Sequence, residues 1–147
     1  MSKFLALLAA GWLLCVSLAT SAAESHVALV KSVSGRVTIA HDGDTRDAES
    51  GTRLHADDRV VAAADATAAI VFKDGTMVTL GGGADIHVVD YVFEPKAGKY
   101  AFSLYMRKGS AIYESGKIGK LAPESVKLET PKATVAVRGT RFLIEVD

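Results

Sequence analysis

The sequence predicts an all-β domain, either a compact β-sandwich or a short β-roll built from about ten short strands. Short apolar runs rich in Val, Ile, Phe and Tyr recur about every ten residues, which is the strand spacing of such folds. Glycine-containing pairs such as Ser34–Gly35, Lys108–Gly109 and Ser115–Gly116 separate these runs, as turns separate strands. Only Ala62–Ala69, where alanines cluster, competes as a helix, and it is too short to change the prediction. The predicted strands are Val27–Val30, Val37–Ala40, Arg59–Ala62, Ala68–Lys73, Met77–Leu80, Ile86–Phe93, Tyr100–Met106, Ala111–Tyr113, Val126–Leu128, Thr134–Val137 and Phe142–Val146.

Two of these runs alternate most clearly. In Tyr100–Met106 every second residue from Tyr100 onward is large and apolar, and in Phe142–Val146 the same holds from Phe142 onward. Because side chains alternate between the two faces of a strand, each segment is expected to turn one face toward a core.

The strands on either side of Asp74–Gly75 are predicted to form a hairpin. Asp-Gly favours a two-residue turn, because both central positions of that turn need positive φ. Pairing across such a turn places Phe72 opposite Met77 and Val71 opposite Val78, so both faces of the pair carry apolar side chains. A pair of this kind is expected to be covered on both faces and to lie at the centre of the domain.

Residues 1–23 have the three parts of a secretory signal peptide. Lys3 gives a positive start, an uncharged run rich in Ala and Leu follows to residue 18, and small residues lead to Glu24. We therefore expect cleavage after Ala23 and a mature domain of residues 24–147. An uncleaved membrane anchor is the alternative, because the apolar segment nearly reaches the ~20 residues of a spanning helix. A lipoprotein is disfavoured, since Leu14 before Cys15 is too large for the usual lipidation site.

Cleavage there leaves 124 residues with no cysteine, 16 basic and 17 acidic side chains. A cysteine-free chain that enters an oxidising compartment suits a bacterial periplasm better than a disulfide-dependent secreted niche, so a periplasmic or secreted location is expected. The near-zero net charge gives no broad attraction to nucleic acid or to anionic lipid. Neither nucleic acid nor, after removal of the signal, a membrane is an expected partner.

The most specific pattern is Thr130–Phe142, which reads T-P-K-A-T-V-A-V-R-G-T-R-F. It resembles the signature of the FecR-domain family, T-P-x-A-x-x-x-V-R-G-T-x-F. The matching positions are Thr130, Pro131, Ala133, Val137, Arg138, Gly139, Thr140 and Phe142. Further family-type positions follow in order upstream, from Gly35-x-Val37 through Asp74-Gly75-Thr76 to Lys108-Gly109, so the resemblance covers most of residues 27–146.

This resemblance implies an extracytoplasmic all-β module that binds and does not catalyse. Family members act in bacterial cell-surface signalling, where the module lies in the periplasm. There it stands between a membrane helix with a sigma-factor-binding tail and a domain that contacts a TonB-dependent receptor. The sigma-regulator role is not carried over, because a cytoplasmic segment and an internal membrane helix are not expected here. Family members also continue past the motif, so the domain is expected either to close early or to lack its final strands at Asp147.

No pattern in the sequence points to catalysis or to a bound cofactor. A G-x-S-x-G elbow is missing, and a cysteine-free mature chain excludes thiol catalysis and thiolate metal sites. The acidic segment Asp42–Asp47 lacks the ligand order of a calcium loop. The histidines are scattered without an H-x-x-x-H pair: His26, His41, His55 and His87. We therefore expect no metal, no cofactor and no enzymatic activity.

The motif and the Asp74–Gly75 turn are interpreted as structural. The motif residues in question are Thr130, Pro131, Arg138, Gly139, Thr140 and Phe142. Arg138 has apolar neighbours, so its guanidinium either pins the turn at Gly139 or contacts a ligand or partner, and the structural role is favoured.

Two functions stay open for such a module. The first is binding of an unknown envelope protein in cell-envelope sensing or signalling. The alternative is binding of a cell-envelope polysaccharide or peptidoglycan, which requires exposed aromatic side chains clustered around one groove.

Overall fold

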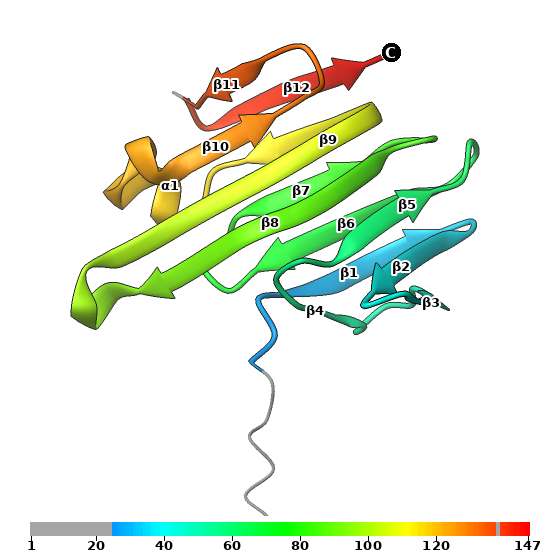
Figure 1. Ribbon diagram of the computed structural model, residues 1–147, viewed down its shortest axis with the longest axis horizontal. Coiled ribbons are helices and arrows are strands. Elements are labelled where there is room, and N and C mark those ends of the chain that lie inside the picture. The colour runs from blue at the N-terminus through cyan, green and yellow to red at the C-terminus, as the bar shows by residue number, and fades with distance from the viewer. Residues whose placement is uncertain (1–24, 138) are drawn as a thin grey trace, which may run out of the picture.

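In the part of the chain that the structure describes, twelve strands form one sheet that curls into a half-barrel, with a short helix beside it (Figure 1). This computed structural model describes residues 25–137 and 139–147, and the all-β class predicted from the sequence is confirmed. The expected signal peptide, residues 1–23, lies outside the described residues. Within them, no helix has the length and hydropathy that a membrane crossing requires. The strands are β1 (Ala28–Ser34), β2 (Val37–His41), β3 (Asp44–Asp47), β4 (Arg53–Leu54), β5 (Arg59–Ala62), β6 (Thr67–Phe72), β7 (Met77–Leu80), β8 (Asp85–Glu94), β9 (Lys99–Glu114), β10 (Val126–Glu129), β11 (Thr134–Ala136) and β12 (Arg141–Val146). The helical segments are η1 (Pro95–Ala97), α1 (Lys117–Leu121) and η2 (Pro123–Ser125).

The 16-residue strand β9 joins two halves of this sheet. Residues 99–108 pair with β8 and, in parallel, with β10, whereas residues 109–114 pair with β7 and β12. We call β3, β2, β5, β8, residues 99–108, β10 and β11 the β8 half-sheet. We call β4, β1, β6, β7, residues 109–114 and β12 the β7 half-sheet.

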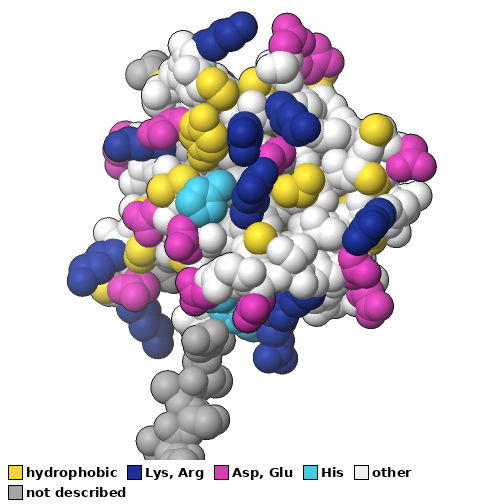
Figure 2. Space-filling model, turned by 45° about the vertical axis from the view of Figure 1, so that its right-hand side comes forward, with side chains coloured by type: hydrophobic (Ala, Val, Ile, Leu, Met, Phe, Trp, Pro, Cys, Tyr) yellow, Lys and Arg dark blue, Asp and Glu magenta, His cyan; other side chains and the backbone are white. Residues whose placement is uncertain are grey.

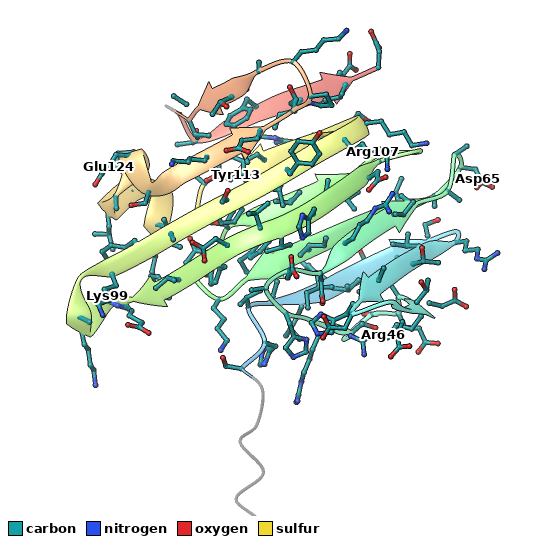
Figure 3. The ribbon with its side chains drawn as sticks, in the orientation of Figure 1. Arg46, Asp65, Lys99, Arg107, Tyr113 and Glu124 are labelled. Atoms are coloured by element: carbon teal, nitrogen blue, oxygen red, sulfur yellow. The ribbon has the colours of Figure 1, made fainter. Side chains whose placement is uncertain are left out.

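The hydrophobic core lies between the two half-sheets. Phe72 of β6 contacts Phe102 of β9 and Tyr91 of β8, with ring centroids 4.9 and 5.3 Å apart. Tyr113 of β9 (Figure 3), which is 1% exposed, continues the aromatic group from Phe102 to Phe142. Burying one such ring is worth up to about 3 kcal/mol, so this cluster holds the half-sheets together.

The predicted alternation of Tyr100–Met106 and Phe142–Val146 is confirmed. Phe102, Leu104 and Met106 are buried and the residues between them are only partly so. In β12 the even-numbered residues are half-buried against the core and the odd-numbered ones are exposed.

The turn predicted at Asp74–Gly75 is wrong in its register. The Phe72 N–H donates to the Thr76 carbonyl at 2.8 Å and the Gly75 N–H to the Phe72 carbonyl at 2.9 Å, so the loop has three residues, 73–75. Only Gly75, with φ of 86°, takes a positive φ there, as in hairpins that end in a left-handed glycine. Val71 therefore faces Met77, and both point outward, half-buried. The prediction that both faces of this pair are covered is wrong within the described residues.

A two-residue Asp-Gly turn does occur, at Asp42–Gly43 between β2 and β3. Its φ values are 47° and 84°, and His41 pairs with Asp44 across it. The same dipeptide thus builds two different turns in this chain.

Two further differences concern strand boundaries. Lys108–Gly109, predicted as a turn, lies inside β9, where Gly109 has φ of 90°. A Cβ there would lie 2.4 Å from the Ala84 Cα, so only glycine lets the strand pass at this point. Strands β3 and β4 were not predicted, because β3 is polar and exposed and β4 has two residues.

Candidate functional site

The C-terminal motif begins with the turn of the β10–β11 hairpin. The Thr130 N–H donates to the Ala133 carbonyl at 2.8 Å, and the Ala133 N–H donates to Thr130 Oγ1 at 3.1 Å. Pro131 is exposed at the tip of this turn, where a missing N–H costs nothing. Thr130 therefore closes the hairpin through both its backbone and its hydroxyl.

The remainder of the motif connects β11 to β12. Gly139 has φ of 131°, in the region that favours glycine. The Thr140 carbonyl accepts a hydrogen bond from the Ser115 N–H at 2.7 Å, and the Phe142 ring packs on Tyr113 at 5.1 Å. Arg138 lies outside the described residues, so its role stays a prediction.

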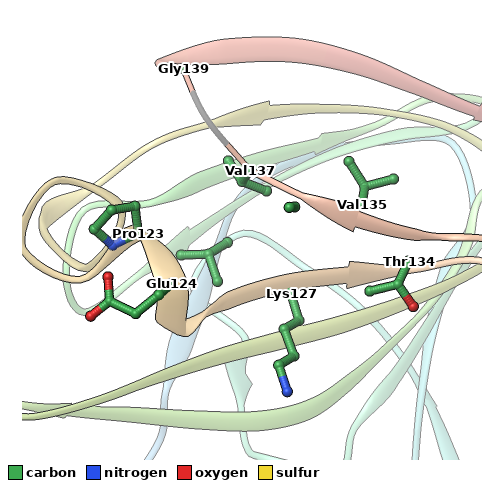
Figure 4. A pocket seen from close by; sticks show the side chains of 9 residues that line it. Pro123, Glu124, Lys127, Thr134, Val135, Val137 and Gly139 are labelled. Atoms are coloured by element: carbon green, nitrogen blue, oxygen red, sulfur yellow. The ribbon is translucent and has the colours of Figure 1, made fainter.

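A cleft of about 730 Å³ opens beside this motif (Figure 4). Strand β11 and its continuation, residues 134–137, form one wall, and Val126 and Lys127 of β10 lie beside them. Pro123 and Glu124 form the opposite wall. Most of the residues that line the cleft are apolar, and its two charged side chains are Glu124 and Lys127. The sequence did not indicate Pro123, Glu124 or Lys127 as site residues.

Strand β11 also presents a free edge, since it pairs with β10 alone among the described strands. The bond from Thr130 N–H to the Ala133 carbonyl marks the first hydrogen-bonded pair of the hairpin. Bonded and non-bonded pairs alternate along an antiparallel ladder, so Val135 is the next residue bonded to β10. The backbone groups of Thr134 and Ala136 consequently point away from β10. Such an edge is able to accept another strand.

The Asp74–Gly75 turn is, by contrast, a closed polar network. Asp74 is 2% exposed, and its carboxylate accepts hydrogen bonds from four donors. These are Thr76 Oγ1 at 2.7 Å, the Thr76 N–H at 3.3 Å, the Tyr91 hydroxyl at 2.9 Å and the Ile118 N–H at 3.0 Å. The cost of burying this carboxylate is therefore offset by its hydrogen bonds.

Asp74 also starts helix α1, which the sequence did not predict. The helix begins after Gly116 and has no side-chain cap of its own. The Lys117 N–H donates to the Asp74 carbonyl at 2.9 Å, and the Ile118 N–H donates to the Asp74 carboxylate. Asp74 thus satisfies two of the first N–H groups, as an N-cap residue does, from 44 positions before Ile118.

The two tyrosines around this network are held in the protonated form. Burial, together with the nearby Asp74 carboxylate, raises the pKa of Tyr91 above its usual range, so its hydroxyl remains a donor to Asp74. Burial likewise raises the pKa of Tyr113. The Tyr113 hydroxyl lies near the Ser115 and Thr76 side chains, but it makes no hydrogen bond of normal geometry within the described residues.

The histidines are engaged mainly with carboxylates. His41 Nδ1 bonds the buried Asp58 carboxylate. The same carboxylate also accepts a hydrogen bond from the backbone N–H of His55 at 2.8 Å. The His41 and His55 rings lie 6.0 Å apart, and His87 Nε2 bonds Asp57 Oδ1 at 2.6 Å. Across residues 25–137 and 139–147, no three His, Cys, Asp or Glu side chains are grouped to hold a metal ion.

Aromatic side chains do not gather around the cleft. None of the described residues that line it is aromatic. Tyr91 and Tyr113 are buried in the core, Tyr100 packs on Phe93 at 6.1 Å, and Tyr105 lies in a separate hollow. The arrangement that polysaccharide binding requires is therefore not found at this cleft.

Comparison with protein families adds one finding. A family model described as FecR protein matches residues 58–147. The match runs from the residue before β5 to Asp147, so it includes both the Asp74–Gly75 turn and the C-terminal motif. Neither a curated protein nor a solved structure was found to match the chain.

Proposed function

The chain belongs to the FecR protein family, and from this premise we propose that it is a cell-envelope binding module that captures a partner protein in sensing or signalling. FecR domains are non-catalytic modules associated with transmembrane signalling in cell-surface signalling systems, and they are typically periplasmic. The partner contacts the module at the edge of β11. An extended segment of the partner pairs with the free edge of β11 and turns side chains into the adjoining cleft.

The free edge of β11 beside an apolar cleft is the observation that carries this proposal. In strand addition the backbone hydrogen bonds supply affinity, and pockets beside the edge supply specificity. Thr134 and Ala136 offer the backbone groups, while half-buried Val135 and exposed Pro123 offer apolar surface at the cleft. The module would thus recognise a short extended segment with apolar side chains on one face.

The β8 half-sheet has a second edge strand, β3, which differs from β11 in its side chains. Strand β3 pairs with β2 alone among the described strands, yet its sequence, Asp44–Asp47, is rich in charge. Charged side chains on an edge strand discourage pairing with other chains. Strand β11 carries Thr134, Val135 and Ala136 and has no such protection.

Site-specific photo-crosslinking tests the proposed function. A photoreactive amino acid replaces Ala136 in one strain and Thr45 of β3, as the matched edge-strand control, in another. We expect a distinct envelope protein to be crosslinked from position 136 and not from position 45. Identical products from both positions, or none from position 136, would contradict the proposal.

A further inference from the structure

The outer face of the sheet carries one basic and one acidic side chain next to the free edge of β11. Lys127 of β10 pairs with Ala136 of β11, and Glu129 pairs with Thr134. Directly paired residues on neighbouring strands share one face of a sheet. Lys127, Ala136 and Thr134 are exposed and Glu129 is half-buried. Leu128, between the two charged residues, is buried, so the charged pair faces away from the core.

These two charges are not neutralised by neighbours. Neither Lys127 nor Glu129 forms an ion pair within the part of the chain that the structure describes. Asp90 of β8, Ser103 of β9 and Lys127 lie in one row, so this face already places opposite charges two strands apart. The place beyond Ala136 has the same spacing from Lys127, about 10 Å. An acidic side chain at that place would stand to Lys127 as Asp90 does, with only the methyl group of Ala136 between them.

The next two positions of an added strand have different neighbours. The residue opposite Thr134 lies in the row of Glu129, and a long basic side chain there reaches across the short threonine toward this carboxylate. The residue opposite Val135 turns to the other face of the sheet. Val135 is half-buried and packs against the core, so an apolar side chain suits the place beside it. The edge thus asks for acidic, apolar and basic side chains at three successive positions.

Recognition by net charge is not available to this molecule. The whole chain has 17 basic and 17 acidic residues. Figure 2 shows a side of the molecule where charged side chains of both signs are interspersed and hydrophobic ones form small separate patches. Charge can therefore select a partner only through the positions of single side chains, as at Lys127 and Glu129.

We propose that the partner segment runs antiparallel to β11 and carries an acidic, an apolar and a basic residue in that order. This inference rests on the proposed function, because the segment has to add to β11. In an antiparallel segment the first of the three residues lies opposite Ala136 and the last opposite Thr134. Antiparallel ladders are slightly more stable per residue than parallel ones. A parallel segment would need the charges in the reverse order, so the order of charges fixes the direction of the segment.

The charges contribute specificity more than affinity. Backbone hydrogen bonds supply most of the affinity in strand addition, whereas exposed ion pairs add little each. In Figure 4 the Lys127 side chain is directed away from β11, so it has to turn to meet the partner. Lys127 is exposed and free to turn, but the ordering of its side chain reduces the gain. We therefore expect discrimination of several-fold between correct and reversed charge orders.

Two labelled, end-capped peptides of identical composition test the inference, T-V-E-V-K-V-T and T-V-K-V-E-V-T. The second peptide meets both charges correctly only if it runs parallel to β11. In fluorescence anisotropy with the exported, purified protein at low salt, we expect the first peptide to bind about fivefold more tightly. The difference should shrink in high salt, where exposed charges are screened. Both peptides should lose affinity for Ala136→Pro, which shows that they bind at the free edge.

A charge exchange in the protein provides the matched test. The double variant Lys127→Glu with Glu129→Lys keeps the net charge and should prefer the second peptide, because the reversed order then meets opposite charges. The double variant Lys31→Glu with Glu145→Lys is the control. It makes the same exchange at two exposed positions of the β7 half-sheet, and the preference of the wild type should be retained. Thermal melts establish that both double variants are folded.

The outcomes separate this inference from the proposed function. Equal affinities of the two peptides, a wild-type preference for the second, or a preference that the exchange at Lys127 and Glu129 leaves unchanged would each overturn the inference. So would the failure of both peptides to bind. In each of these cases the proposed function still holds if photo-crosslinking from position 136 captures an envelope protein. Peptides that bind Ala136→Pro as tightly as the wild type are bound elsewhere, and this result counts against both.

Discussion

The Asp74 turn and the C-terminal motif both lie in the part of the chain that matches the family, yet they are built in opposite ways. At Asp74 a buried carboxylate accepts hydrogen bonds from four donors. At the motif, β11 leaves one edge unpaired among the described strands, and a cleft opens beside it. The contrast shows that a family signature marks two kinds of residue. Some hold the scaffold, and others border a surface that stays open in the described chain.

The two places are physically linked. Asp74 holds the start of α1, and the Ala122 N–H at the end of that helix donates to the Ile118 carbonyl at 2.8 Å. The chain then enters η2, whose residues Pro123 and Glu124 form one wall of the cleft. The closed network therefore positions one wall of the open site.

The largest expected effect on stability comes from breaking the closed network. Asp74→Ala leaves the Ile118 N–H and the Tyr91 hydroxyl buried without their acceptor, which is expected to lower the free energy of unfolding by about 3 kcal/mol or more. Chemical denaturation measures this value. Asp42→Asn is the control at the other Asp-Gly turn, where asparagine tolerates the positive φ, and a change within about 0.5 kcal/mol is expected. If Asp74→Ala and Asp42→Asn lower the free energy of unfolding equally, the two turns do not differ in the way described.

A smaller effect is expected at the connection from β11 to β12. Gly139→Val forces a β-branched residue to φ of 131° and should lower the free energy of unfolding by about 1–3 kcal/mol. A Cβ at this position meets no atom within 4 Å, so the cost is conformational and not steric. The neighbouring Thr140→Ala, which alters an exposed side chain, serves as the control in thermal melts. Wild-type melting of the Gly139 variant would show that the described backbone does not constrain this position.

The sequence predicted the strands well where alternation was strong, as in Tyr100–Met106, because a half-buried strand must alternate. It assigned the two-residue turn to the wrong Asp-Gly pair. The two pairs are identical as dipeptides, and they differ in tertiary contacts: Asp74 is bound by Tyr91 and α1, whereas Asp42 is exposed. Those contacts join residues far apart in the chain and leave no local signal.

The same limit applies to the site. The motif residues, Thr130 and Gly139 among them, were recognisable because their identities follow a fixed spacing. The opposite wall was not, since Pro123 and Glu124 reach the cleft only through a helix that Asp74 caps from a distant turn. The sequence of residues 115–125 by itself predicts neither helix α1 nor the wall that Pro123 and Glu124 form.

The most direct test of the proposed function separates the two edges of β11. Ala136→Pro removes an N–H that points to the free edge, and proline is tolerated on that side of an edge strand. Val135→Pro removes an N–H bonded to β10 and should destabilise the hairpin. The measurement is the affinity of each variant for the partner crosslinked from position 136, recorded together with its thermal melt. We predict that Ala136→Pro melts like the wild type and loses about tenfold or more in affinity, as expected when backbone pairing supplies the binding. Unchanged affinity in Ala136→Pro would contradict strand addition at β11.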